Sequence, residues 1–442
     1  MAAGLGWLGI VRLGLVQTAL GAIVVLTTST MNRVMVIELA LPAMLPGALV
    51  AWHYALQALR PRWGFGADAG RRLTPLIIIG MAILALGGAL SAVAVALMAV
   101  AKLPGIVLAV LAFTLIGVGV GAAGTSLLVL LTKSVAAERR PAAATIVWLM
   151  MIAGFAITAG TAGHFLDPFS LSRLVTVTSI VSVIAFTLAV IAVHGVEAAT
   201  IMPAPVAETA ARPAFRAALL QVWSEPETRL FTIFLFISML AYSAQDLILE
   251  PYAGTFFGLT PGQSTQLSGL QNGGVFSGMV LIALIGGRFG TPQLWTALGC
   301  VLSAIALTLL VVAGEVGPTW PVGPTVFGLG FANGLFAAAA IASMMTLAGM
   351  GRTRREGTRM GVWGAAQAIA FGIGGTLGAV SVDVTRALTG SPLHAYGAVF
   401  LAEAVLFVLA AMMALRIAAR DTRTDRSAAR PTDMIAKLSG RG

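Results

Sequence analysis

The sequence predicts an all-α membrane protein that crosses the bilayer about twelve times. Hydrophobic residues make up 58% of its 442 residues and charged residues only 10%, whereas charged residues are about 25% of a typical soluble domain. The hydrophobic residues are collected in stretches of membrane-spanning length, since about 20 helical residues cross a hydrocarbon core of about 30 Å. This composition excludes most enzyme folds.

The predicted spans follow one another with short connections. In chain order they are 8–36, 41–59, 74–99, 105–132, 142–162, 171–193, 229–254, 265–287, 292–313, 321–348, 361–382 and 394–416. An even number of spans places both termini on the same side of the membrane. The first stretch is far longer than the apolar core of a cleavable signal peptide, so we expect it to remain as the first helix.

The basic residues predict which side the termini face. If the N-terminus is cytoplasmic, Lys and Arg concentrate on the cytoplasmic side, and only Lys102, Arg173 and Arg386 fall on the other, with Arg33 inside a span. Positive charge is retained in the cytoplasm during insertion, so both termini are predicted to be cytoplasmic. The net charge of +10 borders the membrane, which favours contact with anionic lipid headgroups over nucleic acid.

One connection is much longer than the others and divides the spans six and six. It carries Pro203, Pro205 and Pro213. Two six-helix halves joined by a cytoplasmic linker are the architecture of the major facilitator superfamily, whose halves are pseudo-twofold structural repeats. We predict an N-terminal half at 1–194, a cytoplasmic linker at 195–228, a C-terminal half at 229–416 and a polar, disordered cytoplasmic tail at 417–442.

Weak internal echoes support two related halves. Asn32-Arg33 near the end of span one resembles Gln245-Asp246 near the end of span seven. The loop after span two also resembles the superfamily's signature between its second and third helices, and its counterpart after span eight lacks the Asp. We predict that this loop is a conformational latch whose Asp and Arg residues change partners as the halves rock, formed by Gly64, Asp68, Arg71 and Arg72.

Glycine is abundant, with 51 residues, and many glycines within the spans are spaced four apart. Small residues at this spacing let helices approach closely in lipid. The alternative is that glycine faces make room for a large planar ligand or a partner's helix. The pairs of glycines spaced four apart include Gly117/Gly121, Gly269/Gly273, Gly274/Gly278, Gly330/Gly334 and Gly374/Gly378.

Ionisable residues in the spans are the first candidates for a functional site. A charge at mid-membrane costs roughly 2.5–3.5 kcal/mol, so a partner or a water-filled cavity is expected. Asp246 and Glu250 lie one turn apart on one helix face, and Arg33 occupies the matching level of span one, so we predict an ion pair from Arg33 to one of them across the halves. The alternative is that Arg33 reaches the headgroups, about 7 Å away along the helix. The predicted central charged and polar site comprises Arg33, Asn32, Glu38, Gln245, Asp246 and Glu250, and Glu403 is a further ionisable residue in or at the edge of a span.

His53 is the one histidine well inside a span, with Trp52 and Tyr54 beside it. An imidazole nitrogen can ligate the magnesium of a chlorin and aromatic rings can stack on it, although Trp and Tyr also mark membrane interfaces. The candidate pigment contacts are His53, Trp52, Tyr54, Gln271, Asn272 and Gln367. The single cysteine, Cys300, leaves no disulfide framework or Cys-based metal site, and we expect no metal centre or catalytic nucleophile.

Four stretches resemble the PucC/LhaA family, a branch of the major facilitator superfamily found in phototrophs. They are TSTMNRVMVIELALPAMLPG, HYALQALRPRWGFGADAGRRLTP, QDLILEPYAG and GVWGAAQAIAFGIGG. The resemblance runs from about Arg12 to Arg416, and the QD-x-x-LEP and WGAAQAIAFG patterns are its most specific parts. The chain is more similar to the members encoded among bacteriochlorophyll synthesis genes than to the light-harvesting-2 assembly member.

The resemblance implies a membrane assembly factor that is not an enzyme. Such a protein delivers bacteriochlorophyll to light-harvesting or reaction-centre polypeptides, or otherwise assists their assembly, in the cytoplasmic or intracytoplasmic membrane of a phototrophic bacterium. The implied partners are membrane lipids, antenna or reaction-centre polypeptides and bacteriochlorophyll synthesis enzymes. Bacteriochlorophyll is the implied bound cargo, with no covalent cofactor. The alternative function is a proton-coupled secondary transporter of a small solute or tetrapyrrole intermediate, in which Asp246 and Glu250 carry protons.

Overall fold

Hydroxyl and proline residues fix where several helices begin. In the computed structural model, Thr260 caps α11 (Pro261–Ile285) by accepting a hydrogen bond from the backbone N–H of Gln263, whose side chain accepts from the N–H of Thr260. The hydroxyl of Thr291 caps α12 (Pro292–Val316) by accepting from the N–H of Leu294, and that of Ser170 caps α8 (Leu171–Val193) by accepting from the N–H of Arg173. Proline suits a first helical position because its missing N–H has no helical partner there.

The structure describes residues 5–57, 72–136, 139–197, 223–286, 288–349 and 356–438. Twelve long helices fill these ranges, and the first is continuous from Trp7 to Glu38. It consists of α1 (Trp7–Val25), η1 (Leu26–Thr30), α2 (Met31–Arg33) and η2 (Val34–Glu38). The others, besides α8, α11 and α12, are α3 (Met44–Leu56), α5 (Leu73–Met98), α6 (Lys102–Ser134), α7 (Arg140–Leu166), α10 (Pro226–Phe257), α13 (Val322–Gly349), α14 (Glu356–Thr389) and α15 (Pro392–Leu438), and a short turn η5 (Gly317–Thr319) follows α12.

Ten of these helices are long and apolar enough to cross a membrane by length and composition. The other two are α3, with 13 residues, and α14, and they occur at the second and eleventh predicted spans. Within the described ranges there is no β-strand. The prediction of an all-α protein with about twelve spanning helices is confirmed.

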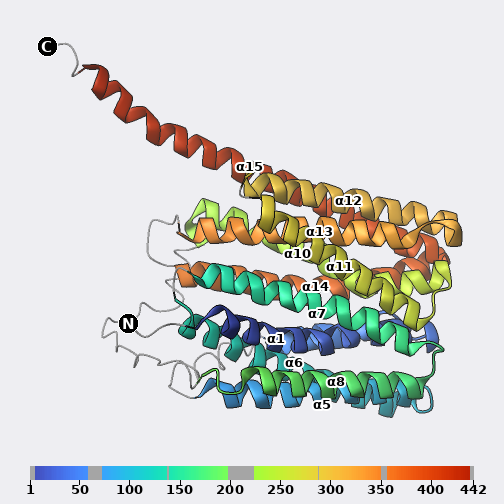
Figure 1. Cartoon of the computed structure of the whole chain (residues 1–442). Helices are drawn as coiled ribbons and strands as arrows, with labels where there is room; N and C mark the ends of the chain where they lie inside the picture. The colour runs from blue at the N-terminus through green and yellow to red at the C-terminus, as the bar shows by residue number, and fades with distance from the viewer. Residues whose placement is uncertain are drawn as a thin grey trace.

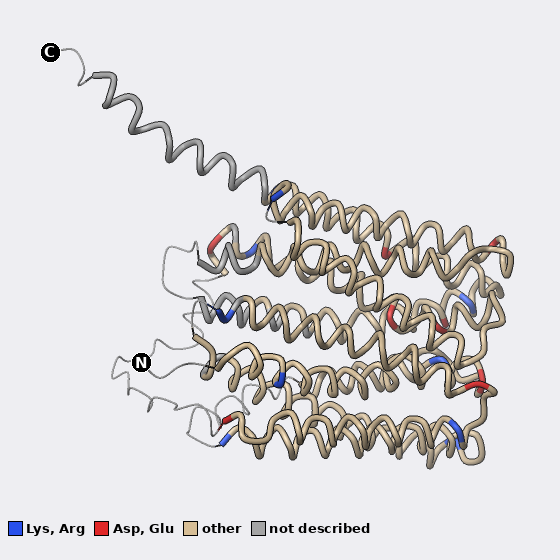
Figure 2. The backbone as a smooth tube through the Cα atoms, in the orientation of Figure 1, with Lys and Arg blue, Asp and Glu red and all other residues tan. Residues whose placement is uncertain are grey.

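Helices that follow one another in the chain run in opposite directions, so their connections lie at the two ends of the bundle (Figure 1). The start of α1 and the point where α15 leaves the bundle lie at the same end, which we call the terminal end. We call the opposite one the distal end. Its connections are 39–43, 99–101, 167–170, 258–260, 317–321 and 390–391. Charged residues lie mostly near the two ends, with few in between (Figure 2).

Glycines bring pairs of helices into backbone contact. A Cβ atom added to Gly274 or Gly278 of α11 would lie 2.3 Å from a carbonyl oxygen of α13, and one added to Gly330 of α13 would lie 2.0 Å from the carbonyl oxygen of Gln271. Side chains could not fit there, so helices fill the glycine faces. Of the two alternatives, close packing accounts for these glycines, whereas Gly273 faces open space.

The buried apolar residues form two main clusters, one for each group of six helices. The first extends from Leu5 to Val196 and takes in one residue of α10, Leu247. The second extends from Phe231 to Ile417. Each group of six helices thus has its own core, and Leu247 extends the first core into the second half. A smaller apolar cluster also joins the halves, where Ile152 of α7 packs against Val275 and Met279 of α11.

Beyond residue 416, the backbone of α15 is helical to Leu438 and runs out of the bundle (Figure 1). A polar, disordered tail at 417–442 stays a prediction. Alanine and arginine are frequent in 417–438, and both are strong helix formers. Most of the predicted linker, 198–222, lies outside the described residues.

Candidate functional site

Two wider turns interrupt the first helix where it meets the second half. The segments η1 and η2 are π-helical, and the single α-helical turn of α2 lies between them. Such turns frequently occur at functional sites, because the extra residue changes the direction in which neighbouring side chains point. Here the neighbouring side chains are hydroxyl, amide and guanidinium groups, and they face α10 and α11.

Polar side chains join the first helix to the second half. The hydroxyl groups of Thr30 and Thr265 lie 2.9 Å apart and those of Ser29 and Ser268 lie 3.1 Å apart. The amide of Asn32 donates to the carbonyl oxygen of Leu247. Because Thr30, Thr265 and Asn32 are buried, each hydrogen bond compensates for polar groups that have left water.

Arg33 does not form the ion pair with Asp246 or Glu250 that we predicted. Its Nη1 lies 2.6 Å from Oε1 of Glu38 on its own helix, and its Nη2 donates to the carbonyl oxygen of Leu259 at 2.5 Å. Residues 34–38 form a π-helical turn, which brings the i+5 carboxylate onto the face of Arg33. The Arg33 side chain is only 3% exposed, so it does not reach the headgroups either.

Glu250 is the acid of the second half that interacts electrostatically with the guanidinium of Arg33. Arg33 acts on Glu250 through its charge, and Oε1 of Glu250 accepts a hydrogen bond of 2.5 Å from Ser268. Its second oxygen, Oε2, is buried and has no hydrogen-bond partner. Arg33 therefore links the halves through a backbone carbonyl and a longer-range attraction.

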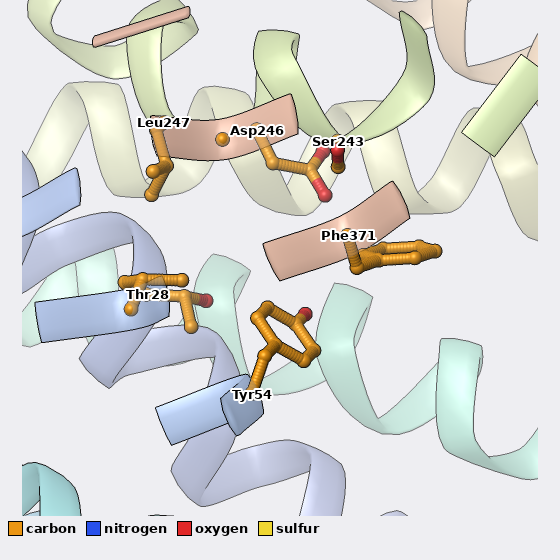
Figure 3. Close-up of a pocket in the computed structure, with 8 residues that line it drawn as sticks. Thr28, Tyr54, Ser243, Asp246, Leu247 and Phe371 are labelled. Atoms are coloured by element: carbon orange, nitrogen blue, oxygen red, sulfur yellow. The ribbon is translucent and has the colours of Figure 1, made fainter. Parts of the chain in front are cut away.

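A small cavity of about 30 Å³ lies between the halves at mid-bundle (Figure 3). Its walls come from η1 and α3 on one side and from α10 and α14 on the other. This volume holds about two water molecules. The lining residues are Thr28, Val50, Tyr54, Ser243, Asp246, Leu247, Phe371 and Gly375.

Asp246 is the acidic group of this cavity. Its carboxylate lies beside Ser243, and the rings of Phe371 and Tyr54 face the same space (Figure 3). None of the lining residues is a cation. Glu403 of α15 lies near enough to Asp246 for their charges to repel, and both of its buried carboxyl oxygens are without a hydrogen-bond partner. The two acids thus lack a compensating positive charge among the groups that surround the cavity.

Gln245 is the most isolated member of the predicted polar site. It is fully buried, and neither its amide nitrogen nor its amide oxygen has a hydrogen-bond partner. The structure therefore divides the predicted site in two. Asn32, Arg33, Glu38 and Glu250 belong to the contact between the halves, while Asp246 belongs to the cavity.

The pigment-contact candidates do not form one cluster. His53 is buried, and its Nε2 lies 2.9 Å from Nε2 of Gln57. Trp52 is 45% exposed and donates to the hydroxyl of Thr114. Of the three neighbours on α3, only Tyr54 reaches the cavity.

The amide candidates lie on two other helices. Gln271 is buried in the glycine contact between α11 and α13, and Asn272 donates to the carbonyl oxygen of Ser268. Gln367 of α14 contacts the sulfur of Met239 at 3.8 Å and precedes Phe371 by one turn. A direct role of these residues in pigment contact stays a prediction.

Most of the predicted latch loop lies outside the described residues. This holds for Gly64, Asp68 and Arg71, while Arg72 is described and precedes the first turn of α5. Among the described residues no group of three or more His, Cys, Asp or Glu side chains could hold a metal ion.

Sequence reasoning named Tyr54 but missed Phe371 and Tyr242, the two rings beside it at the cavity. The rings of Tyr54 and Phe371 are 5.6 Å apart, and those of Tyr242 and Phe371 are 5.8 Å apart. These three rings therefore join the two halves beside Asp246. Phe371 stood within the WGAAQAIAFG pattern, but an apolar residue in an apolar span carries no sign of which way it points.

Comparisons with known proteins agree on family and fold. The family model described as PUCC protein matches residues 30–422. A Rhodobacter capsulatus protein named bacteriochlorophyll synthase 44.5 kDa chain is 54% identical over 94% of this chain and 96% of its own length. The same organism's Protein PucC is 29% identical over 94% of this chain and 93% of its own.

Among solved structures, the nucleoside transporter NupG is similar with a TM-score of 0.65 and 13% identity, covering 92% of this chain and 98% of that one. That likeness shows the fold, a bundle of the major facilitator type. The family match and the 54% identity to the synthase-chain relative show the family as well. The chain belongs to the PUCC protein family, a family of photosynthesis-related membrane proteins.

Proposed function

We propose that this protein is a membrane assembly factor that delivers bacteriochlorophyll to light-harvesting or reaction-centre polypeptides, or otherwise assists their assembly. In this proposal the protein is located in the cytoplasmic or intracytoplasmic membrane of a phototrophic bacterium, and both of its termini face the cytoplasm. The observation that carries the proposal is 54% identity, over nearly the whole chain, to a relative named as a bacteriochlorophyll synthase chain. In this proposal the protein receives pigment from synthesis enzymes and catalyses no step itself.

The cavity limits when a pigment can bind between the halves. Pockets for drug-sized ligands are about 300–1,000 Å³, whereas this cavity has about 30 Å³. The state described here is thus closed around the site, and the cargo enters after the halves separate. The rings of Tyr54, Phe371 and Tyr242 then offer faces on which a planar macrocycle stacks.

Deletion of the gene in its phototrophic host tests the proposal. We expect the absorbance of assembled antenna complexes to fall while the capacity for bacteriochlorophyll synthesis persists. Complementation with Phe371→Leu should restore the absorbance only partly, whereas the same substitution at Phe165, which is 65% exposed, should restore it fully. Normal absorbance of every antenna band in a clean deletion, with no homologue compensating, would refute the assembly role.

A second candidate function is proton-coupled transport of a small solute or tetrapyrrole intermediate. The observation that favours it is Asp246 on a cavity without a cation, because such an acid can take up a proton when water reaches it. Flux in proteoliposomes under an imposed pH gradient distinguishes the two functions. Flux that survives Asp246→Asn together with Glu250→Gln would remove both acids from the transport mechanism.

A further inference from the structure

Two aspartates form hydrogen bonds between the halves at the distal end of the bundle. Asp383 of α14 accepts the backbone N–H of Ala43 at 3.1 Å and of Met44 at 2.7 Å, one on each carboxylate oxygen. Asp167, directly after α7, accepts the hydroxyl of Thr260 at 2.9 Å. Each carboxylate therefore meets the first residues of a helix that belongs to the other half.

The two contacts occupy the same position in each half. Asp167 and Asp383 are 216 residues apart. Of the three residues that donate to them, Met44 and Thr260 are also 216 apart, and Ala43 and Thr260 are 217 apart. In both cases the acid lies at the distal end of the fifth helix of its half, and its partner starts the second helix of the other half. Equal spacing on both sides of the interface indicates a repeated device rather than two unrelated contacts.

Close backbone contacts accompany each aspartate on the same helix face. Four residues before Asp383, Ala379 lies 2.9 Å from a Cβ added to Gly47 of α3. Four residues before Asp167, Gly163 has no room for a Cβ, which would lie 2.5 Å from the carbonyl oxygen of Gly262. These contacts need the halves to touch at the distal end, so both aspartates meet their partners only while that end is closed.

The two aspartates differ in what they supply. The helix α3 has no side-chain cap of its own, since residue 43 is alanine, and Asp383 satisfies N–H groups that have no partner within the helix. Its negative charge also lies at the positive end of the helix dipole. The helix α11 already has a capping box from Thr260 and Gln263, and Oδ1 of Asp167 is buried without a partner. The contact of Asp383 is therefore the stronger of the two.

We propose that Asp383 and Asp167 form a matched pair of latches that hold the distal end closed, with Asp383 as the main latch. Separation of the halves at that end uncaps α3 and breaks the contact to Thr260 together. The latch concerns the movement of the halves and holds for any cargo, so its test does not depend on the assembly role.

Spin labels at the distal end measure the opening directly. Leu103 of α6 and Leu388 of α14 are 72% and 82% exposed and lie in different halves, and replacement of the single Cys300 by Ser leaves no other cysteine to label. Double electron–electron resonance on the full chain in nanodiscs then gives the distance distribution between the labels introduced by Leu103→Cys and Leu388→Cys.

We expect Asp383→Ala to add a population at longer distance and to raise the ratio of open to closed protein by about tenfold, the factor that about 1.4 kcal/mol produces. Asp167→Ala should raise it less, and the double variant most. Asp383→Asn keeps one acceptor and the side-chain volume, so a smaller shift in the same direction is expected, and it replaces the alanine variant if that one does not fold. Glu315→Ala, which removes an exposed carboxylate at the same end, should leave the distribution unchanged. Wild-type distributions in both Asp383 variants and in Asp167→Ala would overturn the proposal.

Discussion

At the scale of single residues, backbone groups pair with several buried or partly buried charges in this protein. Arg33 donates to the carbonyl oxygen of Leu259, and Asp383 accepts from the N–H groups of Ala43 and Met44. Arg12 likewise donates to the carbonyl oxygen of Ala192 at the end of α8. Helix ends carry unpaired backbone groups in fixed positions, so they can pair with a charge without a second charged side chain in the membrane.

Replacement of Arg33 by alanine should destabilise the protein by about 2–4 kcal/mol. The estimate lies between the loss of a hydrogen bond from a charged donor and the breaking of a fully buried ion pair, because Glu38 is partly exposed. Thermal unfolding in detergent measures it. The additional change Glu250→Gln should recover part of the loss, since Glu250 is within the electrostatic reach of Arg33, whereas Asp246→Asn should not. Purely additive losses with Glu250→Gln would show that Arg33 does not act on Glu250.

The pairing of Arg33 also marks the limit of sequence reasoning at this scale. The sequence indicated that Arg33, Asp246 and Glu250 lie at similar depth, and all three do lie near the contact between the halves. The sequence did not indicate in which direction these three side chains point. The π-helical turns at Leu26–Thr30 and Val34–Glu38 rotate the side chains that follow, and no periodicity in an apolar span marks such a turn.

At the scale of helices, hydropathy predicted where the spans lie, because length and apolar content are what a bilayer requires. The ends were harder to predict. The helix α10 begins at Pro226 and ends at Phe257, three residues beyond each end of the predicted span 229–254, and Gly258 follows it in the left-handed conformation that ends helices. The caps that fix these ends include contacts from distant helices, such as Asp383 at α3, which no local pattern shows.

Glu197 caps another helix from a distance and gives a pH-dependent prediction. Its carboxylate accepts the N–H groups of Leu73 and Thr74 at the start of α5, at 2.8 and 2.9 Å. Partial burial acts to raise the pKa of Glu197, but these hydrogen bonds outweigh it and hold the pKa below its ordinary value. A lowered pKa means that the charged carboxylate stabilises the folded state above about pH 4.3, and that this stabilisation is lost as the pH falls through the folded-state pKa.

Glu197→Gln should therefore lower the free energy of unfolding by about 0.5–1 kcal/mol at neutral pH. The difference from the wild type should shrink as the pH falls through the lowered folded-state pKa of Glu197, because below that pKa both side chains are neutral. Thermal unfolding in detergent across this range provides the measurement, with Glu315→Gln as a control at an exposed carboxylate. A difference that is independent of pH would show that the charge of Glu197 does not stabilise α5.

At the scale of the whole molecule, two cores meet along a contact that contains polar side chains, the aromatic rings beside the cavity and a small apolar cluster between α7 and α11. The cores follow from the apolar composition of each group of six helices. The contact between them contains the glycine, hydroxyl and carboxylate groups that position the halves. A bundle built this way can separate along one surface while most of each core stays packed, with Leu247 the one residue of the second half in the first main cluster of described residues. We infer that the closed cavity is one state of such a movement.

The most direct test of the assembly account is whether the protein carries pigment between its halves. The measurement is the amount of bacteriochlorophyll per protein after purification of the full chain in mild detergent from pigmented cells, with an unrelated multi-span protein from the same cells as background. We expect pigment at a fixed ratio above background for the wild type and for Phe165→Leu, and clearly less for Phe371→Leu, because the ring of Phe371 contacts those of Tyr54 and Tyr242. Pigment at the background level in all three, from cells that assemble their antenna complexes normally, would contradict the assembly account.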